Sequence, residues 1–235
     1  MIRRLGGGLR HPPGLFRESY PEELWATKNV LRLNSGRFLF TLKYLKSYNA
    51  IMSQIFKHIQ NRSLAHVMRF NLKPQHFPES VADHSYFTAY IVSILCHLLE
   101  KEGLVLDKQK ALEMALVHDM EEMFSGDIVT PFKHYSSEVE DAIKKVNKEL
   151  IGEVFAGLPA ELAEHYIALW NEEGAGQSIE AQVIKVADKL SLIAKCAEEV
   201  HVGNEFFQEI YDLGIKFLQE YDKPWWQKIK EKILI

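Results

Sequence analysis

The chain has 235 residues, of which 47% are hydrophobic and 26% charged, a balance typical of a soluble globular protein with one sizeable core. Its formal net charge of −4 is unevenly spread, because residues 1–51 hold nine Lys and Arg against three Glu and leave −10 for the remainder. An acidic body lacks the clustered basic side chains that neutralise phosphates, which excludes a general surface for a nucleic-acid polymer.

The sequence also argues against a membrane-spanning segment and against a zinc site made of cysteine thiolates. The longest strongly apolar run, residues 91–99, is too short to span a bilayer, so we expect no membrane segment. Cys96 and Cys196 each lie in a helical apolar pattern, and no CxxC pair occurs. We therefore expect buried free thiols in a reducing compartment, a cytoplasmic protein, and no thiolate zinc site.

Residues 1–51 form a basic N-terminal extension without a persuasive hydrophobic period. It begins with glycine, arginine and proline, and four arginines precede its first acidic residue, Glu18. This pattern faintly resembles an organellar transit peptide or a basic arm. A disordered extension, or a start codon assigned too early with Met52 as the true start, are the alternative interpretations.

From Ser53 onward the apolar residues recur at helical spacing, and no segment predicts a strand. The sequence predicts an all-α fold, a single bundle of about six or seven helices over residues 52–221, followed by a C-terminal tail over 222–235. Asp83 is the expected N-cap of the second helical segment. The expected helices cover 53–70 (one or two short helices), 86–99, 108–124, 139–155, 159–170, 179–202 and 205–220.

Polar residues converge on one strip of the expected helix 108–124. His118 and Glu122 are four residues apart and project from nearly the same side, with Asp119 one step round. Two imidazoles and two carboxylates, from His84, His118, Asp119 and Asp188, would form a mixed nitrogen and oxygen site for one divalent cation such as Mn²⁺, Co²⁺, Fe²⁺, Ni²⁺ or Zn²⁺.

Each of these residues also has a simpler interpretation. A histidine near a helix N-terminus, such as His84, often caps the helix or faces solvent. Asp188 lies on a mostly apolar helix, where an unpaired carboxylate is costly, and Lys185 or Lys189 would satisfy it without any cation.

The order H…HD…D on a helical background resembles the HD-domain superfamily of metal-dependent phosphohydrolases. A closer resemblance, over about residues 52–217, is to the YfbR-type 5′-deoxyribonucleotidases and their eukaryotic HD-domain-containing relatives. It also places Arg69 where that family has an arginine ahead of a bulky aromatic residue. The matching strings are ESVADHS (79–85), HDMEE (118–122), SGD (125–127), TP (130–131) and KVADK (185–189).

The resemblance implies a single HD domain and hydrolysis of the 5′-phosphate from nucleoside monophosphates, with deoxyribose preferred. It implies one divalent cation held by His84, His118, Asp119 and Asp188. Glu122 would orient or deprotonate the attacking water, which the cation activates. Asp127 would lie near the sugar and assist catalysis, and Arg69 would hold the phosphate through its guanidinium.

Phe70 departs from the family pattern, which has Trp in the example considered, a ring held to crowd the ribose 2′ position. A smaller ring leaves more space for a 2′-hydroxyl, so we expect the deoxyribose preference to be retained but weaker. The resemblance also implies a homodimer, for which the apolar C-terminal helix with Trp225 and Trp226 would supply a surface.

Three alternatives remain open. The same chemistry would serve another nucleotide, namely a dNTP, a cyclic nucleotide or an alarmone. The chain would otherwise be a metal- or nucleotide-binding regulatory module without turnover, against which Glu122 and Asp127 both argue. A second metal would use His134 and His165, which fall between the HD pair and Asp188 but lack the dinuclear pattern around them.

Overall fold

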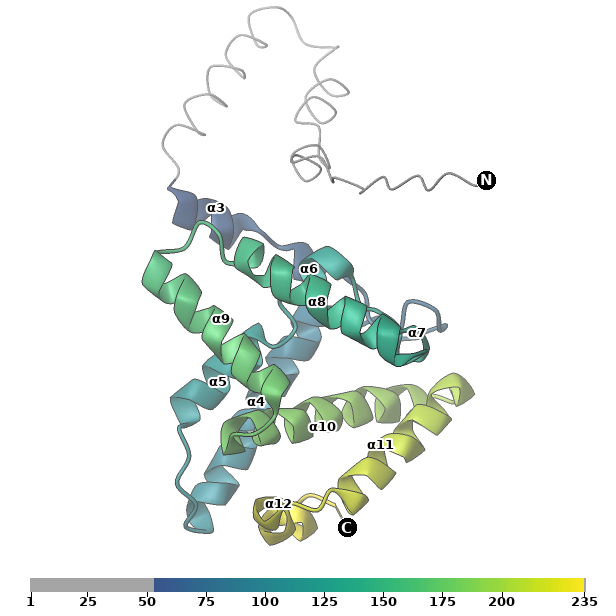
Figure 1. The fold of residues 1–235 in the computed structure, drawn as a ribbon. Helices are drawn as coiled ribbons and strands as arrows, with labels where there is room; N and C mark the ends of the chain where they lie inside the picture. Colours follow the sequence, from purple (N-terminus) through teal and green to yellow (C-terminus); the bar gives the residue numbers. More distant parts are fainter. Residues whose placement is uncertain (1–52, 235) are drawn as a thin grey trace, which may run out of the picture. The chain divides into compact units, whose positions relative to one another are not determined.

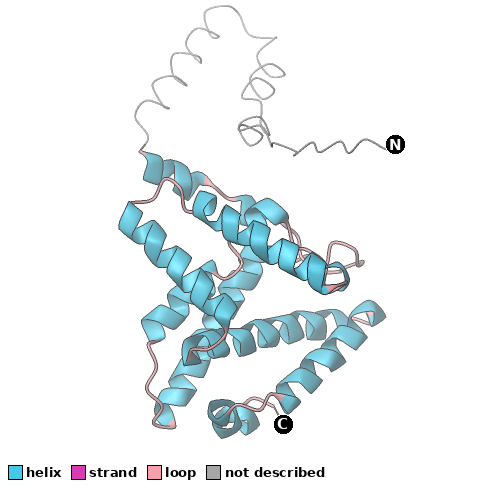
Figure 2. Cartoon of the chain, viewed as in Figure 1, coloured by secondary structure: helices cyan, strands magenta, loops and turns pink. Residues whose placement is uncertain are grey.

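The computed structural model describes residues 53–234, so the extension predicted over 1–51 lies outside the described residues. Within residues 53–234 the regular elements are helices, and the pairings of strand type are two isolated bridges, Met68 with Ser80 and Ala156 with Leu158 (Figure 2). The all-α fold is therefore confirmed. None of the helices in this range has the length and apolarity needed to cross a membrane.

Among residues 53–234, six helices of ten or more residues make up the body of the bundle (Figure 1). They are α4 (Val81–Lys101), α5 (Lys108–Val117), α8 (Ser137–Val154), α9 (Ala160–Ala175), α10 (Ile179–His201) and α11 (Gln208–Glu220). The shorter elements are α3 (Gln54–Gln60), α6 (Glu122–Ser125), α7 (Thr130–Lys133), α12 (Pro224–Ile229) and the 3₁₀ turns η1 (Ser63–Ala65), η2 (Glu205–Phe207) and η3 (Lys230–Lys232).

The core forms where α10 packs against α4, α5 and α11 (Figure 1). Leu95 and Leu99 of α4, Met114 of α5 and Ile184 of α10 are at most 1% exposed. Complete burial of an aliphatic side chain of this size contributes about 1.5–3 kcal/mol. A shared apolar core thus fixes α4 and α10, which carry His84 and Asp188, to α5, which directly precedes His118 and Asp119.

Helix α4 begins earlier than expected, and Ser80 rather than Asp83 is its N-cap. The Ser80 hydroxyl accepts a hydrogen bond from the Asp83 backbone N–H at 3.1 Å, and the Asp83 carboxylate accepts from the Ser80 N–H at 3.0 Å. Asp83 is the third helical residue (N3) and completes a capping box with Ser80, a role that a short acidic side chain also fills. His84 consequently lies one residue further on, at the end of the first turn.

The helix expected over 108–124 is interrupted, so His118 and Glu122 do not share one continuous helical strip. Helix α5 ends at Val117, and four turn residues precede α6. Hydrogen bonds from Met120 N–H to Val117 C=O and from Glu122 N–H to Asp119 C=O join residues three apart, which tightens the turn relative to an α-helix.

The C-terminal segment is part of the bundle, and its tryptophans are not available as a dimer surface. Trp225 is 5% exposed and Trp226 is fully buried among core side chains. The Trp226 indole N–H donates to the Leu218 carbonyl at 2.8 Å, which fixes α12 to the end of α11. The expectation that these two rings face a second subunit was wrong, because this chain's own core covers them.

Candidate active site

His118 directs one of its two ring nitrogens into a buried polar cluster. Its Nδ1 lies 2.8 Å from the Ala115 carbonyl, which can only accept, so Nδ1 carries a proton. Its Nε2 is buried without a hydrogen-bond partner, although Asp119 Oδ2 is 3.1 Å away. A buried imidazole nitrogen is costly to leave unpaired, and an imidazole fixed by its other nitrogen is the usual form of a metal ligand.

His84 faces the same cluster from α4 and is 1% exposed. Its Nδ1 lies 3.0 Å from Ser191 Oγ and 2.9 Å from Arg69 Nη1. Two neutral tautomers are compatible with these contacts. If Nδ1 carries the proton and donates to Ser191, the lone pair of Nε2 is available to a cation. If Nδ1 instead accepts from Arg69, the proton lies on Nε2. A bound cation would select the first tautomer.

The structure brings three of the four predicted cation ligands together. His84, His118 and Asp119 each offer a ligand atom, and these atoms all lie within 4.8 Å of one another. Asp188 Oδ1 lies 3.1 Å from His84 Nε2, but Asp188 does not belong to that compact group. The donors suit a borderline divalent cation, and the fourth predicted ligand, the Asp188 carboxylate, lies at the edge of the cluster with 37% of its side chain exposed.

The charges in the cluster are strongly coupled. Burial alone would lower the pKa of His118, but Asp119, Asp188 and Glu173 raise it to about 10. Burial would raise the pKa of Asp119, but His118 and His84 hold it well below the usual range. Burial is likewise outweighed at Asp188, where His84 lowers the pKa to about 2. The cation-free cluster is therefore an imidazolium with two carboxylates.

Two further carboxyl groups border the cluster from the turn after α5. Burial, followed by the charges of Asp119, Asp127 and Glu121, raises the pKa of Glu122 to about 9. Burial and the Asp119 charge raise the pKa of Glu121 to about 7, although the Trp170 indole N–H donates to it at 2.7 Å. Crowded carboxylates of this kind resist full ionisation unless positive charge is added.

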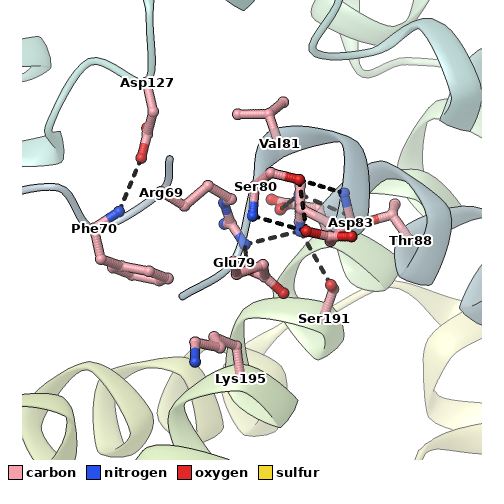
Figure 3. Close-up of polar contacts among 12 residues, drawn as sticks. Arg69, Phe70, Glu79, Ser80, Val81, Asp83, Thr88, Asp127, Ser191 and Lys195 are labelled. Carbon is pink, nitrogen blue, oxygen red and sulfur yellow. Dashed lines mark hydrogen bonds and ion pairs between the residues drawn. The ribbon is translucent and has the colours of Figure 1, made fainter. Parts of the chain in front are cut away.

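Arg69 supplies fixed positive charge beside the cluster. Its Nη1 pairs with Glu79 Oε2 at 2.6 Å, and both side chains are about one-tenth exposed. Burial would lower the pKa of Arg69, but Glu79, Asp188 and Asp119 raise it, so the guanidinium stays charged. The guanidinium lies 5.1 Å from the centre of the Phe70 ring (Figure 3).

Phe70 has a backbone conformation that is unusual for a residue with a side chain. Its φ is +54°, in the left-handed region, which costs about 1–3 kcal/mol and persists only where the surrounding structure holds it. Its N–H donates to Asp127 Oδ2 at 3.2 Å (Figure 3), and its ring packs edge-on against Phe207 with 5.1 Å between centres. The two residues predicted to meet the sugar are therefore joined to each other.

The two histidines and two lysines of the alternative interpretations have partners of their own. His134 pairs with Glu140 and His165 with Glu113, and neither histidine belongs to the three-residue cluster. Asp188 pairs with His84, whereas Lys185 and Lys189 place their ammonium groups over the Phe217 ring at 5.9 and 5.5 Å. The lysine alternative for Asp188 was wrong.

Sequence reasoning missed the residues that support the cluster. Glu79 received no role, although it directly precedes the Ser80 cap of the helix that carries His84. Ser191, Lys195 and Glu199 follow Asp188 at spacings of three, four and four residues on α10, and all three are buried. Polar residues at helical spacing within an otherwise apolar face were the signal that would have found them.

The arrangement matches a known class of protein. A helical bundle with a His, His-Asp cluster between three core helices is the fold and site of the HD-domain phosphohydrolases. One solved structure of that description, from Listeria innocua, superposes with a TM-score of 0.67 at 27% identity, over 77% of this chain and 86% of the other. A protein from Pyrococcus horikoshii superposes with a TM-score of 0.62 at 27% identity, over 76% of this chain and 95% of the other.

The sequence comparisons place the chain more narrowly. The model of the YfbR-like 5′-deoxynucleotidases matches residues 54–234. Among curated relatives, the 5′-deoxynucleotidase of Shewanella oneidensis is 31% identical over 157 residues, or 66% of this chain and 79% of that protein. The 5′-deoxynucleotidase of Vibrio parahaemolyticus is 28% identical over 156 residues, with the same two shares covered. The chain belongs to the YfbR-like 5′-deoxynucleotidase family.

Proposed function

We propose that this chain is a metal-dependent 5′-deoxynucleotidase, which hydrolyses deoxyribonucleoside 5′-monophosphates to the nucleoside and inorganic phosphate. The observation that carries the proposal is the buried cluster of His84, His118 and Asp119, whose ligand atoms all lie within 4.8 Å of one another. Membership of the family supports the same activity.

His84, His118 and Asp119 would hold one divalent cation, and Asp188 would complete the set from α10. Imidazole and carboxylate donors fit Mn²⁺, Co²⁺, Fe²⁺ or Zn²⁺, and the chemistry of the donors does not choose among them. Such a cation, when bound, lowers the pKa of a coordinated water and neutralises phosphate oxygens.

The remaining steps fall to side chains around the cluster. Arg69, kept charged by Glu79, would hold the phosphate oxygens through two parallel N–H groups. Glu122 would orient the attacking water and take its proton, for which its closeness to Asp119 and Asp127 is the support. Asp127 would assist at the sugar while its carboxylate holds the Phe70 backbone.

We also propose that the enzyme is a cytoplasmic homodimer. Helix α4 carries no Lys, Arg, Asp or Glu between Asp83 and Glu100, and its exposed apolar side chains include Tyr86, Phe87, Tyr90 and Ile94. In an otherwise acidic body, an uncharged apolar face is where two copies approach without repulsion. Tyr90→Glu should shift a dimer to monomer in sedimentation, and an unchanged mass would reject this surface.

The cytoplasmic location is supported by the two buried free cysteines, which fit a reducing compartment.

The activity is tested by phosphate release from the purified chain with dNMPs, NMPs, dNTPs and cyclic nucleotides, each with Mn²⁺, Co²⁺, Mg²⁺ and Zn²⁺. We expect dNMPs to be the best substrates and a chelator to abolish turnover. Selective turnover of dNTPs or cyclic nucleotides would overturn the substrate assignment. Activity that survives Asp119→Ala or Glu122→Ala would overturn the mechanism.

A further inference from the structure

Helix α10 presents a line of polar side chains toward the segment that carries Arg69 and His84. Asp188 and Ser191 contact His84, at 3.1 and 3.0 Å. Lys195 and Glu199 continue the line one and two turns later, and Figure 3 shows Ser191 and Lys195 on this helix beside Arg69 and Glu79. The first two residues serve the cation cluster, which leaves a buried ion pair that the proposed mechanism does not use.

Glu199 is fully buried and accepts hydrogen bonds from three separate segments. Its Oε1 accepts from the Phe77 N–H at 2.9 Å and from Lys195 Nζ at 2.7 Å. Its Oε2 accepts from the His76 N–H at 3.0 Å and from Asn204 Nδ2 at 2.8 Å. Lys195 Nζ also donates to the Phe77 carbonyl. A buried charge is tolerated only when it is paired this completely, and here two of the four donors are backbone N–H groups of one loop.

That loop, residues 71–79, begins directly after Arg69 and Phe70 and returns to them. The Arg69 N–H donates to the Glu79 carbonyl at 2.9 Å, and the Lys73 N–H donates to the Phe70 carbonyl at 2.8 Å. The Gln75 side chain donates to the Arg69 carbonyl at 2.8 Å. The conformation of Arg69 and the positive φ of Phe70 are thus held from the loop, and Glu199 holds the loop.

We propose that Glu199, paired with Lys195, is a positioning residue that sets the loop 71–79 and thereby places Arg69 and Phe70 for the phosphate and the sugar. The inference rests on the proposed function, because that assigns Arg69 and Phe70 to the substrate. Residues on one face of α10 would then act on two different sites. Asp188 and Ser191 would support binding of the cation, and Lys195 and Glu199 would support binding of the substrate. If Glu199 had a merely structural role, its substitution would lower the stability of the fold, but it would not weaken substrate binding while leaving cation binding unchanged.

The test is Glu199→Gln in the full chain. The amide oxygen can still accept from Phe77 and Lys195, but the amide NH₂ faces two donors, His76 N–H and Asn204 Nδ2, and loses both bonds. We expect KM for dAMP to rise about tenfold while kcat stays within threefold and Co²⁺ affinity, measured by calorimetry, stays within twofold. Ile184→Val, which trims a buried side chain of α10 away from the loop, is the control for a general loss of stability and should leave KM unchanged.

The outcomes separate the two proposals. No turnover of dNMPs by the unmodified chain rejects the proposed function. Turnover with an unchanged KM in Glu199→Gln rejects the positioning role alone, as does a KM that rises equally in Ile184→Val. If Glu199→Gln does not fold, Asn204→Ala decides, because it removes one donor to Glu199 and one bond to Pro74. We expect about a threefold higher KM with normal Co²⁺ affinity, and an unchanged KM overturns the inference.

Discussion

The backbone N–H of Phe70 donates to the carboxylate of Asp127 at 3.2 Å, across 57 residues of sequence. One carboxylate therefore reaches the proposed sugar site and holds a residue of left-handed conformation beside it. Hydrogen bonds to charged groups contribute about 1.5–3 kcal/mol. Loss of this one should disturb selection at the sugar as well as turnover.

Asp127→Ala is expected to lower kcat/KM for dAMP at least tenfold and to reduce the dAMP to AMP ratio of kcat/KM, because the Phe70 ring is no longer fixed. Steady-state kinetics with both nucleotides measures this. Asp141→Ala removes an exposed carboxylate and is the matched control. A lower rate with an unchanged dAMP to AMP ratio would show that Asp127 does not act through Phe70.

Phe70→Trp is expected to sharpen deoxyribose selection, because a larger ring excludes the 2′-hydroxyl more completely. We expect the unmodified chain to prefer dAMP to AMP, and the variant to increase that ratio about tenfold, the lower end of the range that a small change of pocket size gives. Competition assays with mixed dAMP and AMP report the ratio directly. Equal turnover of the two nucleotides by the unmodified chain would contradict this assignment of Phe70.

Cation affinity is expected to rise with pH. His118 has a pKa of about 10 in the cation-free cluster, so a cation must displace its proton, whereas Asp119 and Asp188 are already ionised. Each unit of pH below that value therefore weakens binding about tenfold for the one proton released. Calorimetry of Co²⁺ binding between pH 6 and 8, in buffers of different ionisation enthalpy, counts that proton. Affinity independent of pH would be inconsistent with a protonated His118.

Glu121→Gln is expected to stabilise the cation-free protein at pH 8 but not at pH 5. The pKa of Glu121 is raised to about 7 in the folded state, so ionisation opposes folding and stability falls as pH rises from about 4.5 to 7. Ionisation of Glu121 lowers the free energy of unfolding by at most about 3 kcal/mol, and partial solvent exposure of the side chain reduces this effect. The amide oxygen can still accept from Trp170.

Urea unfolding at both pH values, with a chelator present, measures the difference. Glu149→Gln changes an exposed carboxylate and should have no such effect. An equal gain at pH 5 and pH 8 would show that the ionisation of Glu121 is not the cause.

A chain that begins at Met52 is expected to fold and to keep the kcat/KM of the full chain, because the family match begins at residue 54 and the site residues all follow it. Thermal unfolding and dAMP turnover of the two chains test this. A loss of activity on removing residues 1–51 would give the basic extension a part in substrate binding.

Much of the fold was predictable because its helices are long and periodic. The helix expected over 179–202 is α10, and the helix expected over 139–155 is α8, each within about two residues at either end. The turn after Val117 was not predictable from apolar spacing. It depends on tertiary contacts of His118 and Asp119 with α4, such as that of Asp119 with His84. Within the turn, the Glu122 N–H donates to the carbonyl three residues back, at Asp119, rather than four residues back as in an α-helix.

Within the site, the local motifs were readable but the long-range partners were not. His84, His118 and Asp119 were grouped from sequence, and the structure brings their ligand atoms together. The pairing of Arg69 with Glu79, and of Glu199 with the loop backbone, joins side chains whose contact depends on how the segments fold back. Hydrophobic periodicity predicts which face is buried but not which polar groups meet there.

The burial of Trp226 has a consequence for how the protein is made. Helix α12 packs against α4, although α4 begins at Val81 and α12 at Pro224. Almost all of the chain therefore has to leave the ribosome before α12 can cover its contact surface on α4. Until then this apolar surface is accessible to chaperones and proteases. Stop codons or frameshifts before Trp226 should remove the protein through degradation, even though His84, His118, Asp119 and Asp188 are already translated.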